Sequence, residues 1–146
     1  MDWRQRYSFR RYHWRQCAGN IAAESIPDSA PLPDSKDAFL ESMAEAGKSV
    51  ADYLDGNILY INVMNRLSVD CDCDGSPAEP DMHDIGILAS FDPVAVDQAC
   101  VDLVYSAEDG DSLIQRIESR NGLHTLEHAE EIGLGSREYE LVRIDQ

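Results

Sequence analysis

One segment of the chain gathers most of the side chains that can bind a metal or move a proton. It runs from Asp70 to Asp84 and begins Asp-Cys-Asp-Cys-Asp-Gly, so two thiols, five aspartates and one imidazole fall within fifteen residues. Cys71 and Cys73 are two residues apart, and in extended chain such positions point to the same side. Both sulfur atoms can therefore reach one metal, and thiolates suit zinc, copper(I) or the iron of an iron–sulfur cluster.

Two thiolates supply only half of a tetrahedral ligand set. We expect Asp84 or His124 to complete it, with His83, cluster sulfide or another protein as alternatives. Without a metal, the neighbouring aspartates raise the pKa of a thiol, and they disfavour a nucleophilic cysteine because such a cysteine needs positive neighbours. The sequence leaves open a disulfide between Cys71 and Cys73, or thiols with no metal.

Other patterns in the chain suggest different chemistry. The letters Asp-x-Asp-x-Asp-Gly open a calcium-binding loop, but a strand rather than a helix is expected before them. The run from His124 to His128 matches the H-x-x-E-H pattern of zinc peptidases, but Thr125 is expected to cap the helix and so to leave His124 outside it. A metal-dependent enzyme with Asp84 or Asp97 as general base is a further hypothesis, for which no substrate follows.

Periodicity and capping signals predict the elements that position this segment. A helix is expected over 36–54, where apolar residues recur at steps of three and four and Gly56 follows. A strand is expected over 57–63, whose nearly continuous apolar character suits a sheet covered on both faces, and a second over 85–90. Asp92 and Pro93 predict the start of a helix that ends near Tyr105. The stripe of the first helix consists of Phe39, Met43, Ala46, Val50 and Tyr53 or Leu54.

The remaining chain predicts two short helices, over 112–119 and over 125–132, the second ended by Gly133. Residues 139–144 alternate like a strand. The order of elements predicts an α/β or α+β layered domain, with a small mixed sheet covered by helices. Composition changes after residue 35, so we expect residues 1–35 to be a poorly ordered or non-native segment and linker, and residues 36–146 to be the domain.

Composition narrows the function classes. The 146 residues suit one domain and carry a formal net charge of −16. Five arginines against one aspartate give residues 1–16 a charge of +4, which leaves −20 for the rest and disfavours nucleic acid and anionic membrane as partners. No apolar run is long enough for a membrane span and the N-terminus lacks the apolar part of a secretory signal. Four irregularly spaced cysteines are typical of a reduced, cytoplasmic protein.

From Phe39 to Val142 the chain resembles the uncharacterised iron–sulfur centre protein family (domain of unknown function 362). The motifs that carry the resemblance are Asp70-Cys71-Asp72-Cys73, Asp84-Ile85-Gly86-Ile87-Leu88-Ala89-Ser90, Asp92-Pro93-Val94-Ala95-Val96-Asp97-Gln98-Ala99 and Gly133-Leu134-Gly135-Ser136. The resemblance implies electron transfer or metal binding, through a metal ion (zinc or iron) or an iron–sulfur cluster, and no particular enzymatic reaction.

The chain also departs from that family, because it lacks the closely spaced cysteine runs of a ferredoxin-like insert. It resembles the C-terminal part of such a protein. A fragment of a larger fold is expected to expose a sheet edge or an apolar face. The alternative to metal binding is therefore a non-catalytic domain that acts through a protein partner or a second copy of itself.

Overall fold

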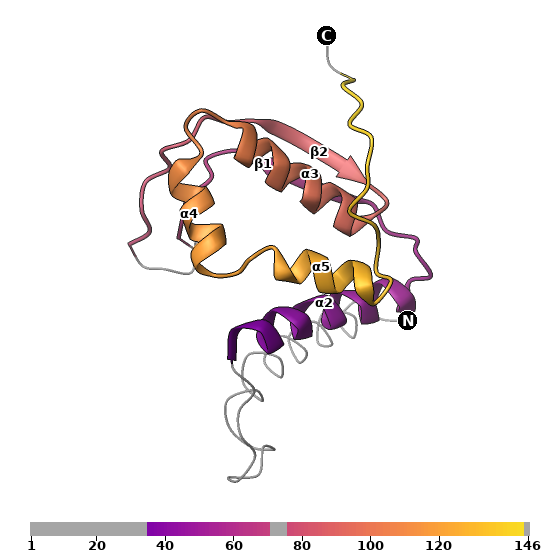
Figure 1. Cartoon of the computed structure of the whole chain (residues 1–146). Helices are drawn as coiled ribbons and strands as arrows, with labels where there is room; N and C mark the ends of the chain where they lie inside the picture. Colours follow the sequence, from indigo (N-terminus) through magenta and orange to yellow (C-terminus); the bar gives the residue numbers. More distant parts are fainter. Residues whose placement is uncertain (1–34, 71–75, 145–146) are drawn as a thin grey trace. The chain divides into compact units, whose positions relative to one another are not determined.

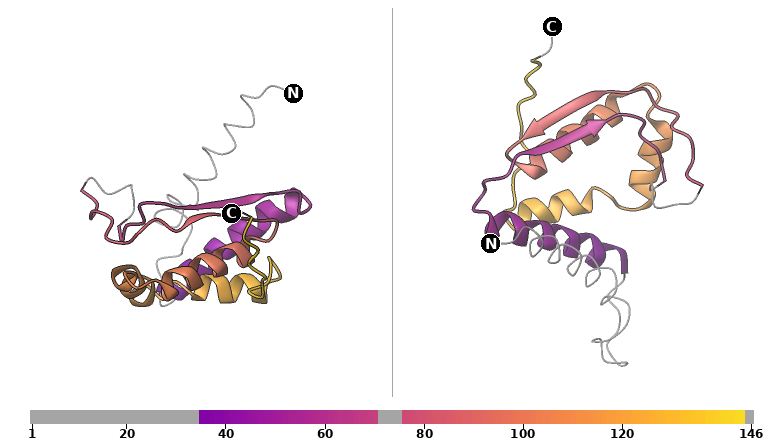
Figure 2. Two further views of the ribbon diagram at one scale, coloured as in Figure 1. Left: turned by 90° about the horizontal axis from the view of Figure 1, so that it is seen from above. Right: turned by 180° about the vertical axis from the view of Figure 1, so that it is seen from behind.

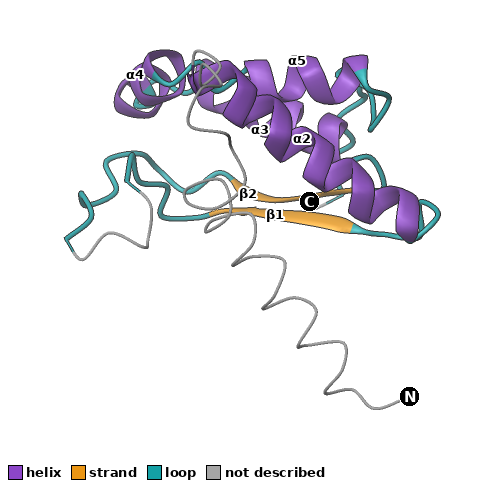
Figure 3. Ribbon diagram, turned by 90° about the horizontal axis from the view of Figure 1, so that it is seen from below, coloured by secondary structure: helices purple, strands orange, loops and turns teal. Residues whose placement is uncertain are grey.

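The computed structural model describes residues 35–70 and 76–144. From residue 34 onward the chain forms one compact unit. Its elements, in chain order, are α2 (Ser35–Tyr53), β1 (Tyr60–Met64), β2 (Gly86–Ser90), α3 (Pro93–Ser106), α4 (Asp111–Ser119) and α5 (His124–Glu131) (Figure 1). The strands form one layer and the helices lie together on one side of it (Figures 2 and 3), which confirms the predicted layered α/β domain. Among the described helices, none has the length and apolar character needed to traverse a bilayer.

The sheet consists of β1 and β2 in antiparallel pairing, with Tyr60 opposite Ser90 and Met64 opposite Gly86. Side chains alternate, so that Met64 is buried and Leu88 half-buried against α3, which crosses this face (Figure 3). The expectation that the first strand lies in a sheet covered on both faces is wrong for the described part of the chain, because every described helix lies on the same side. The uncovered face, called the open face below, consists of Ile61, Val63 and Ile87.

Helix α3 begins where its local signals predicted. The Asp92 side chain accepts hydrogen bonds from the backbone N–H groups of Val94 and Ala95, and Pro93 occupies the first turn, where a missing N–H costs nothing. One side of α3 packs on the sheet and the other packs on α5, so the helix is the centre of the unit. Its Val94 is the largest fully buried side chain among the described residues.

Helix α2 matches the predicted span, and Gly56 follows it with a positive φ of +69°. However, α2 does not bury the stripe that predicted it. It packs against α5 through Ala44, which is buried in a cluster with Val94, Leu126 and Ala129. The stripe residues Phe39, Met43, Ala46, Val50 and Tyr53, called the α2 stripe below, remain exposed.

Helix α5 begins at His124, one residue earlier than expected. Thr125 was predicted to cap it, but the cap position is Leu123 and no side chain caps the helix. Gly133 follows the end at a φ of +74°, as predicted. The helix expected over 112–119 is α4.

The strand expected over 139–144 is not present in the described chain. Leu141, Val142 and Ile144 are exposed, and no ladder pairs this segment with β1 or β2. The Tyr139 hydroxyl instead donates to Asp102 on α3. Alternation alone does not form a strand when no neighbouring edge pairs with it.

Candidate functional site

The segment with the two neighbouring cysteines is closed at its base. Cys71 and Cys73 lie outside the described residues, so their predicted role rests on the sequence and on what flanks them. On either side, Asp70 Oδ2 accepts a hydrogen bond from the Ala78 N–H at 3.0 Å, and Ser68 Oγ donates to the Ala78 carbonyl at 2.7 Å. These bonds, called the stem below, join Ser68 and Asp70 on one side of the two cysteines to Ala78 on the other side.

The stem is attached to α4. Arg116 Nη2 donates to Asp70 Oδ1 at 2.8 Å, and Ser112 Oγ donates to Asp81 Oδ1 at 2.7 Å. The Arg116 and Asp70 side chains are 37% and 29% exposed, so the pair is partly shielded from water. The guanidinium offsets one of the aspartate charges that were expected to disfavour thiolates, and it brings a positive charge to the base of the segment.

Asp84, a predicted metal ligand, lies where the chain returns to the sheet. Its Oδ2 accepts from Asn65 Nδ2 at 2.6 Å and its Oδ1 accepts from the Arg66 N–H at 2.7 Å. Arg66 has a φ of +50°, so the carboxylate satisfies the N–H of a strained turn after β1. Each carboxylate oxygen retains a further acceptor position, so these bonds do not prevent metal ligation.

His124, the other predicted ligand, faces α2. Its Nε2 lies 3.0 Å from Glu41 Oε1 and its Nδ1 lies 3.6 Å from Glu127 Oε2. The hydrogen bond to Glu41 is the main reason why the pKa of His124 is raised above its ordinary value. His128 lies one turn later, with Nε2 3.6 Å from Glu45 Oε1, and this nitrogen is buried without a hydrogen-bond partner among the described residues. Of the H-x-x-E-H run, His124 therefore forms the hydrogen bond that joins α5 to α2.

Asp97 and Cys100 lie on the side of α3 that faces β1. Asn62 Nδ2 donates to Asp97 Oδ1 at 2.6 Å and to Cys100 Sγ at 3.4 Å. Burial raises the pKa of the Cys100 thiol, and the hydrogen bond from Asn62 lowers it in part. Cys100 is therefore a packed, protonated thiol rather than a reactive one.

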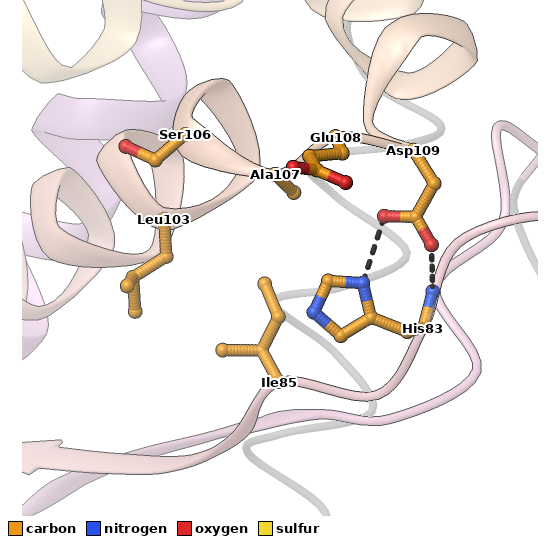
Figure 4. A pocket seen from close by; sticks show the side chains of 7 residues that line it. All are labelled: His83, Ile85, Leu103, Ser106, Ala107, Glu108 and Asp109. Atoms are coloured by element: carbon orange, nitrogen blue, oxygen red, sulfur yellow. Dashed lines mark hydrogen bonds and ion pairs between the residues drawn. The ribbon is translucent and has the colours of Figure 1, made fainter.

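His83 and Asp109 form a pair that sequence reasoning missed. His83 Nδ1 lies 2.7 Å from Asp109 Oδ1, and the His83 N–H donates to Asp109 Oδ2 at 2.8 Å (Figure 4). These contacts, the backbone bond foremost, hold the pKa of the Asp109 carboxyl below its ordinary value. The imidazole lies at the edge of an open cavity of about 660 Å³ that Ile85 and Leu103 also line. No local pattern links His83 to Asp109, because the two are 26 residues apart.

The structure does not assemble the predicted ligands into one visible cluster. Asp84 is bonded to the turn after β1, whereas His124 is bonded to α2. Within residues 35–70 and 76–144, no group of three or more histidine, cysteine, aspartate or glutamate side chains is arranged to hold a metal ion. The predicted set of Cys71, Cys73, Asp84 and His124 therefore remains a prediction.

Comparison with models of known protein families identifies a family. A family model described as "Domain of unknown function (DUF362)" matches residues 4–102, which is more than half of the chain. The match begins ahead of the boundary that composition places at residue 35, and it ends within α3. No curated protein and no solved structure matches the chain.

Proposed function

The chain belongs to the family of the domain of unknown function DUF362, and within that family we propose that it is a metal-binding domain. Cys71 and Cys73 supply two thiolate ligands from the segment that the stem closes. The observation that carries the proposal is the stem itself. A segment whose ends are bonded together and attached to α4 loses less conformational freedom when its thiolates bind a metal.

The donor set suits a single ion better than a cluster. Cluster ligation commonly uses four cysteines, and the chain has four in total. Of these, Cys100 lies on α3 in contact with Asn62, and only Cys71 and Cys73 share a segment. Two thiolates with oxygen or nitrogen donors suit a zinc or iron ion. Zinc would make the site structural, and iron would make it redox-active.

Asp84 is the third ligand that we propose, because it lies at the end of the connection between β1 and β2 that also contains Cys71 and Cys73. His124 is the fourth that we propose. To bind a metal through Nε2 it would have to give up its hydrogen bond to Glu41, which joins α5 to α2. Both assignments are tested separately from the thiolates.

Metal analysis of the full chain, purified without chelator, tests the proposal. We expect wild type to retain close to one equivalent of zinc or iron, and Cys71→Ser/Cys73→Ser to lose it. Cys100→Ser is the matched control, because it removes a thiol outside the segment and is expected to keep the metal. Asp84→Asn and His124→Gln are expected to weaken metal affinity by about tenfold or more. Equally low metal in wild type and in the double variant would contradict the proposal.

A second candidate function is association with another chain. The open face favours it, since Ile61, Val63 and Ile87 are 57%, 59% and 70% exposed and none is charged. Large contiguous apolar patches on a folded protein mark interaction sites. Size-exclusion chromatography with light scattering tests this function, and a folded monomer at all concentrations would contradict it.

A further inference from the structure

The α2 stripe is an apolar surface that the described fold leaves uncovered. Its residues follow one another at steps of four, three, four and three, so they form one line along the helix. Phe39, Met43 and Val50 are 53%, 52% and 52% exposed, and Tyr53 is 87% exposed. This pattern was the clearest helix signal in the sequence, yet α2 packs on α5 through its other side. The exposed stripe therefore favours a partner that α5 does not provide.

Charged and polar groups around the stripe are already satisfied. Glu41 contacts His124 and Lys48 is paired with Asp52, both away from the stripe. On its flank, Ser42 Oγ donates to the Ala38 carbonyl and Ser49 Oγ donates to the Ala46 carbonyl. These two hydroxyls need no water, so burying this flank of α2 leaves neither of them without an acceptor.

The two aromatic residues of the stripe lie at equal distances from its centre. Ala46 is the smallest, and it lies seven residues from an aromatic ring in each direction, Phe39 on one side and Tyr53 on the other. Met43 and Val50 lie between. A small residue at the middle lets two helices approach closely, while larger side chains on each side fill the space where crossing helices diverge. A two-fold axis through Ala46 of two antiparallel helices would set Phe39 of each copy beside Tyr53 of the other, so that the same patch serves both partners.

We infer that the occupant is a second copy of this chain, with the two α2 helices antiparallel and crossing at Ala46. This inference rests on the association proposed above, but it names a second copy as the partner and places the contact on the α2 stripe rather than on the open face. The exposed fractions correspond to roughly 500–600 Å² of stripe on each copy, so complete burial of both stripes would cover roughly 1,100 Å², close to the lower limit for a specific interface. The stripe is uncharged, whereas each chain carries −16 overall. Salt screens that repulsion and is therefore expected to strengthen the dimer.

Sedimentation velocity of the full chain, from about 1 µM to about 100 µM, tests the inference. We expect a reversible dimer whose dissociation constant rises at least about tenfold in Ala46→Glu, because two carboxylates then meet at the axis. Ile87→Glu, which adds the same charge to the open face, is the matched control and is expected to leave that constant within about twofold. Circular dichroism checks that both variants remain folded.

A cross-linking measurement keeps the inference testable if Ala46→Glu does not fold. Under mild oxidation, Ala46→Cys is expected to form a disulfide between two copies of the tryptic peptide 37–48, whereas Tyr53→Cys is expected to form none with itself. A self-link at position 53 would indicate parallel helices and overturn the inference. A dimer broken by Ile87→Glu but not by Ala46→Glu would show that two copies associate through the open face. That result would overturn the inference about the α2 stripe but not the proposed association. A monomer at every concentration and salt would overturn both.

Discussion

Asp92 joins the start of α3 to the chain beyond α5, and its removal is expected to destabilise the whole unit. Its Oδ1 accepts hydrogen bonds from the N–H groups of Val94 and Ala95 at 2.8 and 3.0 Å, and its Oδ2 accepts from the Ser136 N–H at 2.9 Å. Loss of a helix cap costs about 1 kcal/mol, and loss of a bond to a charged acceptor costs about 1.5–3 kcal/mol. Asp92→Ala is therefore expected to lower the free energy of unfolding by about 3 kcal/mol.

Urea denaturation followed by circular dichroism measures this loss. A reduction of about 3 kcal/mol is large against a total of about 5–15 kcal/mol for a domain. Asp92→Asn is the matched control, because its one amide oxygen can still accept from the Val94 and Ala95 N–H groups, whereas its NH2 group cannot accept from the Ser136 N–H. We expect it to cost about 2 kcal/mol, less than Asp92→Ala, because the cap is kept and the bond to Ser136 is lost.

Gly135 provides a sharper test of the same contact. A Cβ at this position would overlap the Asp92 carboxylate, so Gly135→Ala must displace that side chain. In an Asp92→Ala background the carboxylate is absent and the added methyl group has room. We therefore expect Gly135→Ala to destabilise wild type but to have little effect in that background. If the two costs simply add, within about 0.5 kcal/mol, this account of the contact is refuted.

Two other contacts give predictions that the same protein preparations can test. The bond to Glu41 raises the pKa of His124 above its ordinary value of 6.5. The stabilisation that the protonated imidazole gives the folded chain is therefore complete below about pH 6.5, and it is lost as the pH rises through the raised pKa. Between about pH 6 and about pH 8, with metal removed by a chelator, the melting temperature of wild type should fall more than that of Glu41→Gln, and equal falls would contradict this. Arg116→Ala breaks the partly shielded pair with Asp70 and should cost about 1 kcal/mol in urea denaturation. Arg120→Ala, at the exposed end of the same helix, should cost less, and an equal cost would show that the ion pair contributes nothing.

Local signals predicted the elements well. The start of α3 follows from Asp92 and Pro93, whose effects on a helix end depend only on the next few residues. The prediction that Gly56 follows α2 and Gly133 follows α5 is confirmed for the same reason. Each glycine has a positive φ, which residues with a Cβ rarely adopt. These predictions needed no knowledge of the rest of the fold.

Pairing between distant segments was not predictable in the same way. The amphipathic pattern of α2 indicated a helix but not which side α5 would cover. The alternation of residues 139–144 indicated strand propensity, but no edge of the sheet receives that segment. His83 and Asp109 come together only because the chain from the stem to β2 lies along the start of α4. Of the candidate site, the sequence supplied residue types and spacing, while the stem and its contact with Arg116 required the fold.

The packing of α2 on α5 has a consequence for biosynthesis. Glu41 and His124 are 83 residues apart, and Asp92 and Ser136 are 44 apart. A growing polypeptide leaves the ribosome N-terminus first, so α2 is released long before the helix that covers its Ala44 side exists. Contacts over such separations form slowly, because the intervening chain must first be ordered. Translation of α5 and of Ser136 therefore sets the earliest moment at which the nascent unit becomes stable.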